Sequence, residues 1–172
     1  QIHLSCLSFG ESETLILKVK KFNYYLIFLI HLSKFLFFEL MKPFIPTHKD
    51  DFEALSLLEE ASWEEIQPYI KAILEWLQDM NWPVAHRVAN VLYPHVNRFQ
   101  EELVDILLSK DDIWKYGCLS YLLVGNPNFK PDSNLLRELY RIRNQPTKGE
   151  EVEELHEIAN SILSSLGLEN SH

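Results

Sequence analysis

The chain has 172 residues and a formal net charge of −9, and its acidic residues outnumber lysine and arginine by 25 to 16. This balance argues against nucleic-acid binding, because lysine and arginine contacts to phosphates dominate that affinity, and it suits a basic protein partner. Two cysteines, Cys6 and Cys118, are too few for a disulfide scaffold and are typical of a reducing compartment. We therefore expect a cytoplasmic protein with one main domain.

Residues 1–40 differ from the rest of the chain, and the first methionine is Met41. Their apolar run is interrupted by His31, Lys34 and Glu39, whereas a membrane-spanning helix needs about 20 mostly apolar residues. A signal-peptide cleavage site is also missing. We interpret residues 1–40 as upstream sequence foreign to the natural protein. The alternative is an apolar segment that lies on or anchors to a membrane.

A change of composition at Met41 marks the start of the predicted domain, residues 41–172. Asp50 or Asp51 is expected to cap a first helix with Phe52, Leu55 and Leu58 facing inward. The sequence SWEE at 62–65 then predicts a capping box that starts a second helix, and a proline at 68 splits this start from the helix that runs to 78.

A helix, a turn and a second helix are predicted over residues 73–92. The apolar residues recur at helical spacing before the turn (Ile70, Ile73, Leu74, Leu77) and after it (Val84, Val88, Val91, Leu92). Pro83 suits the first turn of the second helix, and Asn81 is expected to cap that helix. So short a connection places the two helices antiparallel with a shared core.

A similar arrangement recurs around residues 103–122, and Trp82 and Trp114 lie 32 positions apart. A period in this range is typical of stacked helical hairpins. Helices are also predicted after Asp132 or Ser133 and after a second capping box at Thr147. The last helix is expected to present one apolar stripe, made of Val152, Leu155, Ala159, Ile162, Leu163 and Leu166.

No alternating strand pattern follows Met41. The predicted fold class is therefore all-α, a short α-solenoid of stacked antiparallel helical hairpins of the HEAT-like kind.

Candidate functional residues gather at the two turns. Asp79, Asp111 and Asp112 stand where helix starts and turns need hydrogen-bond acceptors, so we favour capping over an acid/base or metal-binding role. Trp82 and Trp114 are either platforms for a ligand or, as we favour, seals between hairpins.

Lys115 can bind an acidic group or lie on a solvated helix face. The acidic run 150–154 suits the first turn of a helix and can also dock a basic partner.

The chain shows no convincing catalytic or metal-binding pattern. His156 opens an HExxH zinc motif, but position 160 is asparagine, so the second ligand is missing. His86 and His95 have no cysteine or carboxylate at ligand spacing. Cys118 lies on an apolar stripe and is expected to be buried and inert. We expect no cofactor, no metal and no catalytic residue.

Three segments carry a resemblance to a known family. They are ILEWLQDMNWPVA at 73–85, DDIWKY at 111–116, and the acidic helix that begins after Pro146 and Thr147. Together they resemble a bacterial family of domains of unknown function, number 5071. The resemblance covers roughly residues 45–166. It implies a small, helical, HEAT-like domain and no assigned activity. Residues 1–40 depart from the family pattern, which supports a natural start at Met41.

These observations favour a non-enzymatic module that binds another protein. The candidate partner-binding residues are Asp79, Trp82, Asp111, Asp112, Trp114 and Lys115. A specific form of this hypothesis is an immunity protein that neutralises a basic toxin. The alternatives are an enzyme with an unrecognised site near the Asp79/Trp82 and Asp112/Trp114 turns, and a scaffold tethered to a membrane by residues 1–40.

Overall fold

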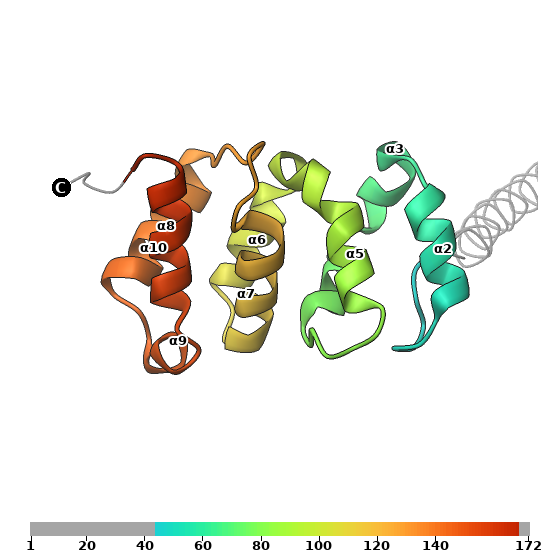
Figure 1. The fold of residues 1–172 in the computed structure, drawn as a ribbon, viewed down its shortest axis with the longest axis horizontal. Coiled ribbons are helices and arrows are strands. Elements are labelled where there is room, and N and C mark those ends of the chain that lie inside the picture. Colours follow the sequence, from blue (N-terminus) through green and yellow to red (C-terminus); the bar gives the residue numbers. More distant parts are fainter. Residues whose placement is uncertain (1–43, 169–172) are drawn as a thin grey trace, which may run out of the picture. The chain divides into compact units, whose positions relative to one another are not determined.

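The structure, a computed structural model, describes residues 44–168, and every regular element in this range is a helix (Figure 1). This confirms the all-α prediction for the described part of the chain. The interpretation of residues 1–40 falls outside the described residues. Within the described range, no helix combines the length and apolar content that crossing a membrane requires.

The chain forms nine α-helices over residues 44–168, which are α2 (Phe52–Glu60), α3 (Trp63–Ile66), α4 (Ile70–Leu74), α5 (Ala85–Leu92), α6 (Gln100–Leu107), α7 (Asp112–Cys118), α8 (Ser133–Asn144), α9 (Lys148–Val152) and α10 (Leu155–Ser165). Short helical turns extend or join them. Three are 3-10 helices, η1 (Gln67–Tyr69), η2 (Glu75–Leu77) and η3 (Tyr93–Arg98), and one is a π-helix, η4 (Leu119–Leu123).

The helices pack in two rows. In the first row α2 contacts α5, α5 contacts η4, and η4 contacts α10. In the second row α4 is joined to α6 by an ion pair between Lys71 and Asp105, and α6 packs against α8. The rows meet where α5 packs against η2, α6 against α7, and α10 against α8 (Figure 1).

Apolar side chains between the two rows form one continuous core. The predicted stripes before and after the first turn supply much of it, since Ile73, Leu77, Val84 and Leu92 are fully buried. Burial of this kind removes apolar surface from water and stabilises each side chain by about 1.5–3 kcal/mol. Helical periodicity therefore located the core correctly.

Side-chain caps start several helices as predicted. Asp51 accepts the N–H of Ala54 at the start of α2, and Asp132 accepts two N–H groups at the start of α8. The capping boxes at residues 62–65 and 147–150 are both present. Because these caps depend on residues within one turn of each other, the sequence alone reveals them.

Three local predictions are wrong. Asn81 does not cap α5, because its N–H and its side-chain amide both donate to Asp79 Oδ1, each at 2.9 Å, and α5 begins only at Ala85. Phe52 is 47% exposed, since the buried stripe of α2 consists of Ala54, Leu55 and Leu58.

The third wrong prediction is the burial of Val152 on the stripe of the last helix, because that helix is broken in two. Glu154 adopts a left-handed backbone, with φ of 55°, between α9 and α10. The break rotates the α9 residues out of the α10 stripe, and Val152 is 71% exposed. The remainder of the stripe is buried from Leu155 to Leu163, and Gly167 has the positive φ expected just beyond a helix end.

Candidate functional site

The first corner lies between η2 and α5 and is closed by local hydrogen bonds. Asp79 accepts from Asn81, which confirms the predicted role of Asp79 as a turn acceptor. Trp82 packs edge-to-face on Trp76, with ring centroids 5.4 Å apart. The two indoles line a shallow hollow of about 260 Å³, whose other lining residues are Ile45, Pro46, Ala72, Glu75 and Gln78.

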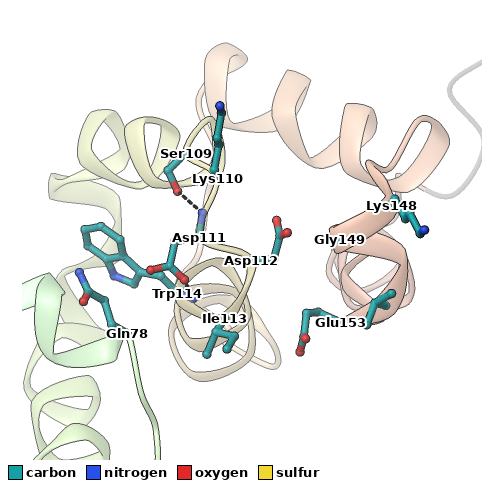
Figure 2. A pocket seen from close by; sticks show the side chains of 11 residues that line it. Gln78, Ser109, Lys110, Asp111, Asp112, Ile113, Trp114, Lys148, Gly149 and Glu153 are labelled. Atoms are coloured by element: carbon teal, nitrogen blue, oxygen red, sulfur yellow. Dashed lines mark hydrogen bonds between the residues drawn. The ribbon is translucent and has the colours of Figure 1, made fainter.

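The second corner lies between α6 and α7, and it begins with a confirmed cap. The Asp111 N–H donates to Ser109 Oγ at 3.2 Å, and Asp111 Oδ1 accepts the N–H of Trp114 at 3.0 Å (Figure 2). The Trp114 indole Nε1–H then donates to the carbonyl oxygen of Leu74 at 2.9 Å. This hydrogen bond from Trp114 joins α7 to α4, as expected of a tryptophan that packs between two hairpins.

Lys115 lies beneath this corner and is buried, with only 2% of its surface exposed, so the solvated-face prediction is wrong. Its ammonium donates to Asp112 Oδ1 and to Glu150 Oε1, both at 2.8 Å. Lys115 therefore does bind acidic groups, but both of them belong to the same chain. Asp112 is correspondingly an ion-pair partner, and the capping role predicted for it is wrong.

Glu150 is the centre of a buried ionic network between α7, α8 and α9. Its carboxylate accepts hydrogen bonds from Lys115, from both terminal nitrogens of Arg141, and from the Thr147 N–H, all at 2.8–2.9 Å. Arg141 also donates to Glu138 at 2.9 Å. The predicted docking role of the run 150–154 does not extend to Glu150, which is fully buried.

The electrostatics of Glu150 follow from two opposing effects. Burial raises the pKa of this carboxyl, because it disfavours the charged form. The hydrogen bonds from Arg141, Lys115 and Thr147 favour the charged form and outweigh burial, which lowers the pKa of Glu150 to about 2. The same contacts raise the pKa of Arg141. Glu150 and Arg141 are therefore both charged at neutral pH.

Two glycines allow the close approaches around the second corner. A Cβ at Gly117 in α7 would lie 2.3 Å from the carbonyl oxygen of Leu77, and a Cβ at Gly149 in α9 would lie 2.0 Å from Asp112 Oδ2. Neither space can hold a larger residue without movement. Glycine at these positions lets α7 pack directly on η2 and lets the Asp112 carboxylate reach α9.

An open groove of about 890 Å³ separates the start of α7 from α9 (Figure 2). Its charged lining residues are Lys110, Asp111, Asp112, Lys148 and Glu153. The apolar side chains of Ile113 and Val152, 56% and 71% exposed, lie on its two walls, and Trp114 also lines it. Exposed apolar side chains in a concave surface are typical of interaction sites.

Trp114 also forms the wall of a smaller hollow, which we call the Trp114 hollow. It has a volume of about 210 Å³ and lies between α4–η2 and α6. Leu74 and Ile106 are its apolar residues, and its polar lining residues are Lys71, Glu75, Glu102, Asp105 and Ser109.

The three hollows adjoin because they share lining residues. Trp114 and Ser109 line both the groove and the Trp114 hollow. The hollow beside Trp76 and Trp82, which we call the Trp82 hollow, shares Glu75 with the Trp114 hollow and Gln78 with the groove. We call this combined surface the corner face. Six carboxylates and three lysines line it, so its charge is predominantly negative.

The structure thus brings together most of the predicted site residues. Asp111, Asp112 and Trp114 line one groove, Trp82 lines an adjoining hollow, and Lys115 lies buried beneath Asp112. Asp79 belongs to the neighbouring turn but lines none of the three hollows.

Cys118 is buried, as predicted, and burial raises the pKa of its thiol. Over residues 44–168, no three His, Cys, Asp or Glu side chains are placed to share a metal ion.

Sequence reasoning missed the residues that hold the second corner from a distance. The sequence places Glu150 in a capping box and in an acidic first turn that could dock a basic partner, and no local pattern singles out Arg141. Glu150 is also the third residue of α9 in its capping box, a position that orients the carboxylate toward Thr147. This position in the capping box, together with the glycines inside two helices, is the feature of the sequence that could have indicated a buried contact here.

The described part of the chain is an all-helical domain whose tryptophan-marked corners form one surface. The chain belongs to the family described as Domain of unknown function (DUF5071), whose model matches residues 44–163. The comparison with curated proteins finds no match.

Proposed function

We propose that this domain is a short α-solenoid of stacked antiparallel hairpins, similar in kind to HEAT repeats, and that it serves in the cytoplasm as a non-enzymatic protein–protein interaction module. The ordered contacts along each row of helices support the solenoid, since each hairpin packs on its sequence neighbours. The 32-residue interval between the two corner tryptophans supports a repeated unit.

The observation that carries the proposal is the corner face. It combines a concave shape, exposed apolar side chains at Ile113 and Val152, and tryptophans whose positions are fixed by contacts within the domain. Fixed aromatic and aliphatic groups in a depression with a charged rim are the usual composition of a protein-binding surface.

A basic partner fits the charge of this surface and of the whole chain, whose formal net charge is −9. Opposite charge speeds the encounter of two proteins and disfavours acidic competitors. An immunity protein that neutralises a basic toxin is one specific form of this proposal.

An enzyme site at the two corners has less support. The carboxylate of Asp79 accepts a hydrogen bond from Asn81, and that of Asp111 accepts the N–H of Trp114 as a helix cap. Asp112 already holds Lys115. Carboxylates committed to such contacts stabilise the corners, and replacing Asp79 and Asp112 by asparagine is expected to lower stability without removing any turnover.

The test is partner capture from the source cell with the full chain as bait, followed by identification of the bound protein. Aspartates at Ile113 and Val152 place two charges on the groove walls and are expected to abolish capture. Leu57→Asp is the matched control, because Leu57 is 41% exposed on α2 and lines none of the three hollows. Capture that survives the groove variant, or fails equally in the control, would refute the proposed surface.

A further inference from the structure

The Trp114 hollow differs from the rest of the corner face because its indole wall is rigid. The hydrogen bond from Trp114 Nε1 to the Leu74 carbonyl oxygen fixes the orientation of the ring, and Leu74 and Ile106 are also lining residues. The hollow, at about 210 Å³, is well above the roughly 30 Å³ that one water occupies in the liquid. A side chain, rather than a single water, is the natural occupant.

The charges on the rim select a cation. Glu75, Glu102 and Asp105 supply three carboxylates, and the one cation lining the hollow, Lys71, is held by Asp105 at 3.1 Å. Within residues 44–168, no hydrogen bond or ion pair occupies the carboxylates of Glu75 and Glu102. Two acceptors therefore remain for an incoming group beside the indole.

We propose that the Trp114 hollow binds an arginine side chain of a basic partner protein. This inference rests on the proposed function, because it names the group by which the partner is held. A guanidinium is planar and weakly hydrated, so it can stack on the indole while its N–H groups donate to Glu75 and Glu102. A lysine ammonium is a compact, strongly hydrated charge and matches this combination less well.

The same pairing already occurs twice within the domain. The guanidinium of Arg98 lies over the Trp63 ring at 5.6 Å, and that of Arg143 lies over the Tyr140 ring at 4.8 Å. The Trp114 hollow offers a comparable aromatic surface, and no cation–aromatic contact of this kind involves Trp114 among the described residues.

The first experiment uses the full chain, labelled at the tryptophan indole nitrogens, and follows the Trp114 indole N–H by NMR. Its resonance is assigned by its absence in Trp114→Phe. The probes are the acetylated and amidated tripeptides Gly-Arg-Gly, Gly-Lys-Gly and Gly-citrulline-Gly. Citrulline keeps the planar shape of arginine without its charge, so it separates stacking from charge recognition.

The arginine tripeptide is expected to shift the Trp114 resonance saturably, with the lysine peptide weaker and the citrulline peptide without effect. Glu102→Gln should weaken arginine binding roughly fivefold, because the amide oxygen can still accept a hydrogen bond but the charge of this partly exposed pair is lost. Glu101→Gln is the matched control, because it makes the same charge change on α6 outside the hollow, and it should leave binding within about twofold. The other three indole signals report whether each variant remains folded.

Equal shifts by arginine and citrulline, or no change on Glu102→Gln, would overturn the assignment. Partner capture separates this failure from failure of the proposed function. A captured partner that depends on Ile113 and Val152, with a Trp114 signal that no probe moves, would remove the arginine site and leave the interaction module in place. Arginine binding at Trp114 without any partner that depends on Ile113 and Val152 would instead overturn the proposed function, and with it the role assigned to the bound arginine.

Discussion

Trp82 and Trp114 mark two corners that connect the second row of helices to the first, but the corners are held together differently. The first is closed by Asp79 and Asn81, which are two residues apart. The second is held by contacts that cross 35 to 40 positions, from Lys115 to Glu150 and from Trp114 to Leu74. One corner is therefore a local turn, and the other is a junction on which four helices depend.

This difference predicts where the domain is vulnerable. An exposed turn loses little when one hydrogen bond is removed, because water replaces the missing partner. A buried ion pair that loses one member leaves an uncompensated charge away from water, which is far more costly. Substitutions at the second corner should accordingly dominate the stability of residues 44–168.

The largest expected effect is that of Glu150→Ala, which leaves Lys115 and Arg141 without their shared carboxylate. We expect the free energy of unfolding to fall by about 3–5 kcal/mol. Urea unfolding followed by circular dichroism at neutral pH measures it. Glu151→Ala is the matched control, since the adjacent Glu151 is exposed, and it should change stability by about 0.5 kcal/mol at most. Similar losses in both variants would contradict a central role for the network.

Acid should weaken the same junction. The pKa of Glu150 is about 2 in the folded state and its ordinary value is 4.5, so its contribution is complete above about pH 4.5 and is lost as pH falls toward 2. The loss is on the order of 3 kcal/mol. Unfolding free energies of the wild type and of Glu150→Gln, measured across this range, should converge as pH falls. A constant difference between the two would show that Glu150 does not titrate as the network requires.

The same division between local and distant contacts explains which parts of the fold the sequence predicts. Capping boxes, prolines and apolar periodicity act within one or two turns, and they gave the helices at residues 52–60, 100–107 and 133–144 nearly correctly. Asp111 was recognised as a helix cap for the same reason. These signals need no knowledge of which helices meet.

The rest depended on partners that no local pattern names. The sequence leaves Lys115 open between a bound acidic group and a solvated helix face, because the carboxylate that buries it comes from position 150. It places Val152 on the buried stripe, because the left-handed residue that breaks the helix, Glu154, is not a glycine. The local pattern could indicate only part of the corner face. The structure places Trp82, Asp111, Asp112 and Trp114 along one surface, but the hollow at Glu75 and Glu102 exists only once α4 and α6 are packed.

Gly117→Ala tests the close packing of the second corner. The added methyl would meet the backbone carbonyl of Leu77 at 2.3 Å, and a backbone atom cannot rotate away, so we expect a loss of about 1–3 kcal/mol despite the better helix propensity of alanine. Gly149→Ala provides the contrast, because its methyl would meet the end of the Asp112 side chain. That side chain can move, and thermal unfolding should show a smaller loss. The reverse order would mean that α7 and η2 separate more easily than this packing implies.

The smallest expected losses of stability come from removing the carboxylate that accepts hydrogen bonds at each corner, Asp111 at the second and Asp79 at the first. Asp111→Ala removes the cap of α7 and should cost about 1 kcal/mol, since the Trp114 N–H loses its partner at the start of a packed helix. Asp79→Ala removes an acceptor from a turn where Asn81 is exposed to water, and should cost about 0.5 kcal/mol. Urea unfolding of both variants, and of the double variant, measures the two losses and shows whether they add. If Asp79→Ala proves the more damaging, the first corner is more than a local turn, and the contrast drawn between the corners fails.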